Sequence, residues 1–279
     1  CLDPYLGTDF HLLSDVKSSK IEVIKDIFPK FSNYKKKFIS KDIFKNKKIS
    51  NYEDFNLVEA IKSDNDDAMF EYFKRHPDKL YSAVLDYGYP GNTALHEAIT
   101  YKSKKCIDAL LLKDLDMTIK NRDGNTVLHL AALTGEINLL YKLILLGSDI
   151  SSRNIKGENV LHSAIRSGSF PCVLFIINNN GNALVNTTNI KGETALFIAA
   201  TTPKANFQIV RHLVEALGAT VLIVNEDNET MLSILSKKKK TMLREQIRTF
   251  LQKVFYQQNS GNYMNLVKQH PEFSLFDME

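Results

Sequence analysis

The sequence has few cysteines, no long apolar run and no signal-like start. Its three cysteines in 279 residues are too few for a disulfide framework. No segment approaches the run of about 18 apolar residues that marks a membrane helix. The start, CLDPYLGTDF, lacks the basic and apolar regions of a secretory signal. We therefore expect no membrane partner and a cytoplasmic location, with the nucleus as an alternative.

Motifs that would support catalysis are also missing. The sequence contains no GxxxxGK[ST] phosphate-binding loop, no GxSxG nucleophile elbow, no HExxH zinc motif and no kinase signature. The formal net charge of +4, from 36 basic and 32 acidic residues, is too small to indicate nucleic-acid binding. We expect a protein that is not an enzyme and holds no cofactor or metal. Because the chain starts at Cys1 rather than Met, a catalytic or targeting segment before it stays an open alternative.

What the sequence does contain is a helix–turn–helix unit over residues 124–150. Thr126 is placed to cap a first helix, and Gly135 is placed to end it. A second helix follows with apolar residues on one face and Gly147 at its end, and these apolar residues are Ile137, Leu140, Leu143 and Ile144. The spacing predicts helices over about 126–134 and 137–146. Two such short helices can bury this face only against a copy of themselves.

Copies of this unit recur along the chain. GNTALHEA begins at Gly91, GNTVLHLA at Gly124, GENVLHSA at Gly157 and GETALFIA at Gly192, so successive starts differ by 33, 33 and 35 residues. A weaker copy, NETMLSIL, begins 36 residues later at Asn228, where asparagine is the usual substitute for a left-handed glycine. The period predicts a stack of at least five repeats.

On these residues the sequence resembles the ankyrin-repeat family, whose repeat carries a G-x-T-x-L-H-x-A core about every 33 residues. The resemblance implies an all-α solenoid of about five recognisable repeats, covering residues 51–240. We expect degenerate capping repeats at both ends, because an end repeat has one face in water. The expected organisation is a capping repeat with a basic insert over 1–50, ankyrin repeats over 51–240 and a C-terminal capping repeat over 241–279.

Residues 30–50 form a basic insert in which eight lysines accompany one acidic residue, Asp42. A solvated connector is the favoured interpretation. A nuclear-import signal and a patch for an acidic partner are the alternatives.

Histidine and cysteine recur at the repeat period and are interpreted as structural. His96, His129 and His162 are 33 residues apart, and stacked repeats would separate them by about 10 Å, too far to share one zinc ion. We expect each imidazole to hydrogen-bond the backbone of the neighbouring loop. Phe197 replaces this histidine in the fourth copy, so that loop should be held differently.

Cys106 and Cys172 occupy the same position on two second helices. Cysteine there is expected to act as a small, buried apolar residue rather than as a reactive thiol.

The resemblance further implies that partners bind a concave surface formed by hairpin tips and exposed first-helix residues. Among these, tyrosine and arginine are the best anchors, because they are over-represented among residues that dominate binding energy. The candidate partner-binding residues are Tyr89, Asn92, Tyr101, Arg122, Asp123, Asn125, Ile155, Lys156, Arg166, Lys191 and Glu193.

The function expected from these observations is a non-enzymatic module that binds or masks an intracellular protein and is monomeric without it. The alternative is a substrate-recruiting or targeting part of a larger enzyme, or of a viral or bacterial effector acting in a host-cell cytoplasm. Inhibitors of NF-κB are a minor alternative, because the DSGxxS segment that usually controls them is missing. The identity of the protein partner is not predicted.

Overall fold

The computed structural model describes residues 56–80, 91–179 and 181–275. Contacts between residues divide the chain into two units, 1–51 and 52–279, and everything described lies in the second. The expected N-terminal repeat and the basic insert, both within 1–50, lie outside the described residues. Across the described ranges the regular elements are helices, joined by loops that contain two isolated β-bridges. The predicted all-α class is confirmed.

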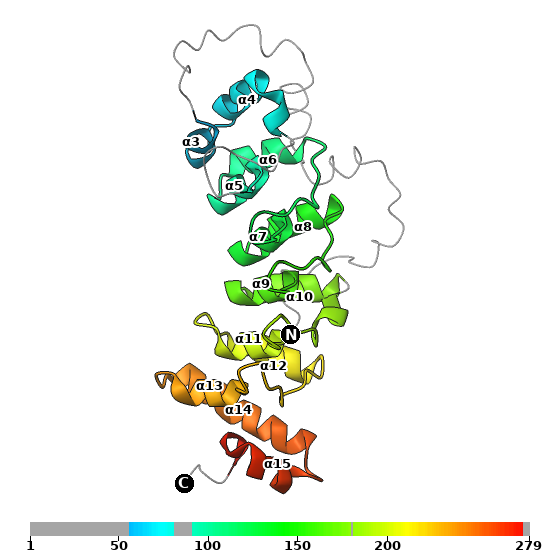
Figure 1. The fold of residues 1–279 in the computed structure, drawn as a ribbon, viewed down its shortest axis with the longest axis vertical. Coiled ribbons are helices and arrows are strands. Elements are labelled where there is room, and N and C mark those ends of the chain that lie inside the picture. The colour runs from blue at the N-terminus through cyan, green and yellow to red at the C-terminus, as the bar shows by residue number, and fades with distance from the viewer. Residues whose placement is uncertain (1–55, 81–90, 180, 276–279) are drawn as a thin grey trace, which may run out of the picture. The chain divides into compact units, whose positions relative to one another are not determined.

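The helices of the second unit follow one another in pairs, and we call the members of each pair the first and second helix of a repeat (Figure 1). The pairs are α3 (Leu57–Lys62) with α4 (Asp66–Arg75), α5 (Ala94–Thr100) with α6 (Lys104–Leu111), α7 (Val127–Thr134) with α8 (Ile137–Leu145), α9 (Val160–Ser167) with α10 (Phe170–Asn178), α11 (Ala195–Thr201) with α12 (Phe207–Glu215), and α13 (Met231–Lys237) with α14 (Met242–Gln258). Helix α15 (Tyr263–Gln269) and a short 3-10 turn, η4 (Pro271–Phe273), follow.

The residues that the repeat motif places at helix ends determine these bounds. In α7, Thr126 is the N-cap, and Gly135 ends the helix in the left-handed conformation with φ 75°. Gly147 follows α8 with φ 89°, and Asn228 has φ 56° at the position where the other copies carry glycine. The helices expected over 126–134 and 137–146 are therefore confirmed, as is the left-handed role of Asn228.

Each repeat packs on the next through both of its helices. First helices contact first helices along the series α3, α5, α7, α9, α11 and α13. Second helices contact one another in the series α8, α10, α12 and α14. The side chains between them include Leu128, Ala131 and Leu140, which are fully buried. Because each repeat covers the apolar face of its neighbour, the unit is a solenoid, as expected.

Two of the three repeat histidines join neighbouring repeats as expected. His96 Nε2 lies 3.1 Å from the carbonyl oxygen of Asn125, and His129 Nε2 lies 3.2 Å from that of Glu158. His162 differs, because its buried Nε2 atom makes no hydrogen bond of ordinary geometry with the described residues, and the Thr187 backbone only weakly raises its pKa. The copies that start at Gly157 and Gly192 are 35 rather than 33 residues apart. We attribute the loss to these two extra residues, which change the loop that His162 faces.

Neither core cysteine should react in the folded protein. Cys106 and Cys172 are both free thiols with 0% exposure, and burial raises the pKa of Cys106 to about 12. Because the thiolate is the reactive form, a Cys1→Ser variant should show almost no rapid reaction with a thiol reagent at pH 8 until urea is added. Rapid labelling of both thiols in the native protein would contradict their assignment to the core.

No helix in the described ranges is long and apolar enough to cross a membrane.

Candidate partner-binding surface

Hairpin tips and the C-terminal ends of the first helices lie on one side of the repeats. Each tip is a dipeptide just before a motif glycine or Asn228. We call these residues together the tip surface. Its tips are 122–123, 155–156, 190–191 and 226–227, and its first-helix ends include Tyr101, Leu133, Arg166 and Thr201. In the repeats of α9 and α11, tip and helix-end residues line a common cavity.

An asparagine shapes each of these four tips, three residues before Gly124, Gly157, Gly192 and Asn228. In the third tip, Asn154 Oδ1 accepts hydrogen bonds from the backbone N–H groups of Lys156 and Glu158 at 2.9 and 3.0 Å. Asn121 and Asn189 make the same pair of bonds, and Asn225 makes the second of them. The sequence analysis missed these residues, although an N-x-x-G pattern at the repeat period was available to find them.

Backbone hydrogen bonds also join each tip to the next. The Ile155 N–H donates to the Asp123 carbonyl at 3.1 Å, and the Ile190 N–H donates to the Lys156 carbonyl at 3.0 Å. The series continues from Glu226 to Lys191 at 2.9 Å. Four successive tips are therefore linked, and the side chains that they carry are held in a fixed order.

Several predicted contact residues are exposed on this surface. Tyr101 is 41% exposed and Ile155 is 62% exposed. Arg122, Lys156 and Lys191 are exposed as well. Asp123 is half-buried. Their contact with a partner stays a prediction, as does that of Tyr89, which lies outside the described residues.

Asn92 is not available to a partner, and its assignment as a contact residue is wrong. Its side chain is only 2% exposed. Its Nδ2 donates to Glu97 Oε1 at 3.1 Å, and its Oδ1 accepts from Asn121 Nδ2 at 2.9 Å. Both groups satisfy buried polar atoms, so Asn92 links two repeats instead of facing solvent.

Asn125 and Glu193, the equivalent residues of later repeats, are half-buried and also have internal partners. Asn125 Oδ1 accepts from Asn154 Nδ2 at 2.9 Å, and Glu193 Oε2 accepts from Asn189 Nδ2 at 2.8 Å. Part of each side chain is therefore occupied by hydrogen bonds within or between tips.

Arg166 is a half-buried partner of an acidic residue and not an isolated surface arginine. Its Nε donates to Glu158 Oε1 at 3.1 Å, and its guanidinium forms an ion pair with the same carboxylate. Glu158 itself is only 5% exposed. Burial alone would raise the pKa of Glu158, but the hydrogen bond and charge of Arg166 lower it below its ordinary value. Arg166 therefore stabilises a buried charge, which limits its availability as an anchor.

The tip surface contains a cavity of about 500 Å³ between the repeats of α9, α11 and α13. Ile198, Thr201 and Thr202 line it together with charged residues from three repeats. The charged residues are Lys156, Glu158, Arg166, Lys191, Glu193 and Lys238.

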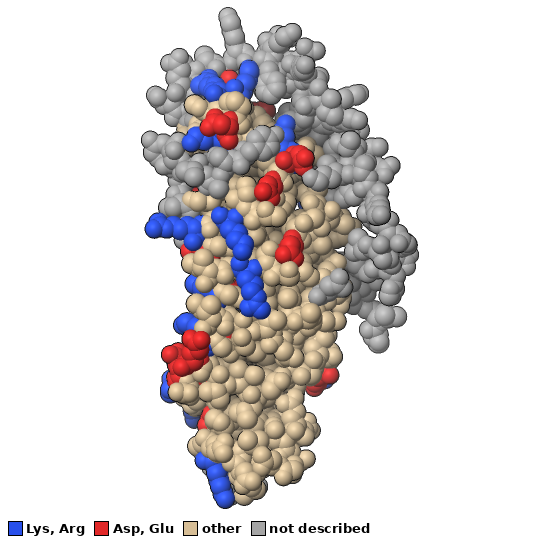
Figure 2. Space-filling view, turned by 45° about the vertical axis from the view of Figure 1, so that its right-hand side comes forward, with Lys and Arg blue, Asp and Glu red and all other residues tan. Residues whose placement is uncertain are grey.

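The opposite side of the repeats has a different character. Figure 2 brings the side of the second helices forward, and over the lower half of this face uncharged residues predominate, with most of the blue side chains at its left-hand edge. In the described ranges, no group of three or more His, Cys, Asp or Glu side chains could hold a metal ion. The cavity on the tip surface is therefore the feature that we consider as a binding site.

Comparisons with known proteins agree with this architecture. No curated protein matches the sequence. A chain in the solved structure of the Bd0816 predatory endopeptidase from Bdellovibrio bacteriovorus in complex with immunity protein Bd3460 is similar, with a TM-score of 0.52 and 22% identity. The match covers 64% of this chain and 89% of that chain, and at this identity it shows the fold alone. A family model described as ankyrin repeats (3 copies) matches residues 57–154 and 128–225, together more than half of the sequence. The chain belongs to the ankyrin-repeat family.

Proposed function

We propose that this protein is a non-enzymatic module that binds a protein partner through its tip surface. Ankyrin repeats are protein-interaction repeats, and the fold presents an extended binding surface. One observation carries the choice of surface: the apolar side chains of Ile155 and Ile190 are 62% and 58% exposed on adjacent tips. Exposed apolar side chains on a backbone that is already ordered can be covered by a partner at little conformational cost.

The solved structure similar to this chain supports a role in protein binding, because it is a complex of two proteins. That likeness does not extend to the identity of the partner. The proposal for this chain is therefore limited to a protein ligand and to the surface that contacts it.

Photo-crosslinking tests which side of the repeats contacts the partner. The photoreactive residue benzoylphenylalanine would replace Tyr101 on the tip surface or Tyr141 on α8, which are matched in residue type and in exposure, 41% and 39%. After irradiation in cells of the source organism, Tyr101→benzoylphenylalanine should give a discrete adduct with another protein, and Tyr141→benzoylphenylalanine should not. A discrete adduct from the Tyr141 position alone would contradict the proposal.

A further inference from the structure

The cavity on the tip surface exists because one repeat departs from a charge pattern that its neighbours keep. Glu158 pairs with Arg166, eight residues later, and Glu229 pairs with Lys237, also eight residues later, at 2.6 Å. The equivalent acidic residue of the repeat between them is Glu193, and eight residues later the chain has Thr201. The short threonine leaves space where the other two repeats place a long basic side chain.

Basic residues from three repeats surround this space. Lys156 and Lys191 approach it from two tips, and Lys238 approaches it from the end of α13, where its ammonium group donates to the Thr201 carbonyl. Together with Arg166, these lysines make four basic residues in the lining. The lining also contains two acidic residues, Glu158 and Glu193. Since Arg166 is already paired with Glu158, three lysines face the single carboxylate of Glu193, and the cavity has an excess of positive charge.

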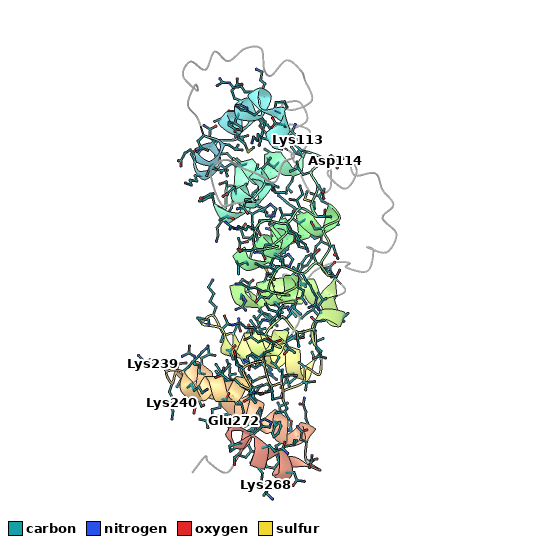
Figure 3. The ribbon with its side chains drawn as sticks, in the orientation of Figure 1. Lys113, Asp114, Lys239, Lys240, Lys268 and Glu272 are labelled. Carbon is teal, nitrogen blue, oxygen red and sulfur yellow. The ribbon has the colours of Figure 1, made fainter. Side chains whose placement is uncertain are left out.

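Lys238 is partly buried at the edge of this space. Burial lowers its pKa below the ordinary value, the nearby Arg244 lowers it further, and Glu193 only partly opposes this. An additional carboxylate in the cavity would stabilise the charged form of Lys238. Lys239 and Lys240, which follow it, point outward from the end of α13 and away from the repeats (Figure 3), and they add positive charge around the same end of the tip surface.

We propose that this cavity binds the carboxylate of an acidic side chain in an extended segment of the partner protein. The excess of lysines selects a negative group, and a volume of about 500 Å³ is within the range of ligand pockets, about 300 to 1,000 Å³. This proposal rests on the proposed function, because it names the chemistry of the partner segment.

The exposed isoleucines define a second feature of that segment. Ile190 lines the cavity, and Ile155 lies on the adjacent tip, about one repeat or about 10 Å away. An extended chain covers this distance in about three residues. The partner segment should therefore carry an apolar residue about three positions from the acidic residue that enters the cavity.

Peptide pools test the proposal with the full chain. Immobilised nonapeptides would have glutamate, glutamine, lysine or phosphoserine at the centre, isoleucine three positions before it and mixed residues elsewhere. The purified protein should be retained at least about fivefold more by the glutamate pool than by the glutamine pool. Equal retention by these two pools, or stronger retention by the phosphoserine pool, would overturn the proposed carboxylate site.

Three variants locate the preference on the molecule. Charge reversal by Lys156→Glu with Lys191→Glu should shift the preference from the glutamate pool to the lysine pool. Thr201→Leu, which copies Leu133 of an earlier repeat, should narrow the cavity at its threonine wall without changing the charge and weaken the preference. Lys253→Glu with Lys268→Glu, a control with the same charge change on α14 and α15, should retain it.

The outcomes separate this inference from the function on which it rests. A glutamate preference that persists in the Lys156→Glu and Lys191→Glu variant would place the acidic site elsewhere. If that variant also forms the Tyr101 cross-link with normal yield, the cavity is excluded while the proposed binding function stands. Absence of a Tyr101→benzoylphenylalanine adduct when Lys156 and Lys191 are unchanged would instead contradict the function itself.

Discussion

Replacing Gly124 by alanine is expected to lower the free energy of unfolding by about 2 to 5 kcal/mol, from left-handed strain and overpacking together. Gly124 has φ +72°, and an added Cβ would lie 2.6 Å from the backbone nitrogen of Ile155. That nitrogen makes the hydrogen bond to the Asp123 carbonyl that joins two tips. The methyl group would therefore push apart two repeats at a backbone contact that cannot rotate away.

Gly147→Ala is the matched control for this effect. Gly147 also has a left-handed backbone, with φ +89°, but an added Cβ would meet nothing in the described structure within 4 Å. Both changes have the same effect on the unfolded chain. The loss of stability in Gly147→Ala therefore measures the cost of the left-handed backbone alone, about 1 to 2 kcal/mol. Urea denaturation followed by circular dichroism measures both. Equal losses for the two variants would show that the tip contact at Gly124 contributes little.

The consequences of Gly124→Ala should extend beyond one loop. In a solenoid, stability depends on the contacts between neighbouring repeats as well as on each repeat. Weakening the contact between the second and third motif copies should broaden the unfolding transition or split it in two, because the repeats on either side lose cooperativity.

The order of the repeats and the bounds of their helices could be predicted because the signals for them are local. Thr126, Gly135 and Gly147 each act on the backbone within a few residues, and the period shows how often the same unit recurs. Such features need no knowledge of distant contacts. Asn228 could be predicted for the same reason, since a left-handed residue is required at that position.

The errors concern residues whose environment is set by another repeat. Asn92 was expected at the surface, but Asn121, 29 residues later, covers it and bonds to it. His162 was expected to bind a backbone carbonyl, but the two extra residues before Gly192 alter the loop it faces. A motif specifies a residue type and a position. It does not specify what the neighbouring repeat brings to that position.

The cavity could not be predicted for a related reason. It depends on Thr201, which is short where the neighbouring repeats have a long basic side chain. It also depends on Lys238, which comes from the following repeat and lies 37 residues after Thr201 in the sequence. In the structure Lys237 is the last residue of α13 and pairs with Glu229, whereas Lys238 turns towards the cavity.

Mild acid is expected to destabilise this protein strongly because three buried histidines remain neutral in the folded state. Burial lowers the pKa of His96 and of His162 from 6.5 to about 4, and it also lowers the pKa of His129. Below pH 6.5 the unfolded chain therefore binds protons that the folded chain does not bind. The stabilisation is fully present above pH 6.5 and is lost as the pH falls towards 4.

The loss should be a large part of the stability of the protein. A lowering from 6.5 to about 4 corresponds to about 3 kcal/mol for each of His96 and His162. Together these approach the whole stability of a typical domain, about 5 to 15 kcal/mol. Urea denaturation at a series of pH values between 7 and 4.5 should show the unfolding free energy falling steadily. A constant value over this range would contradict the neutral, buried state of the histidines.

His162→Phe tests the contribution of one histidine with a residue that the chain itself uses at this position, in Phe197. At pH 7 the replacement removes the Nδ1 contacts with Asn159, whereas the Nε2 atom of His162 has no hydrogen bond of ordinary geometry to lose. The same change at His129 should cost about 1 to 3 kcal/mol more, because it leaves the Glu158 carbonyl without its partner. Below pH 6.5 the His162→Phe variant should lose stability more slowly than the wild type, with a slope smaller by up to one proton. Parallel curves for the two proteins would show that His162 is already charged, or accessible to protons, in the folded state.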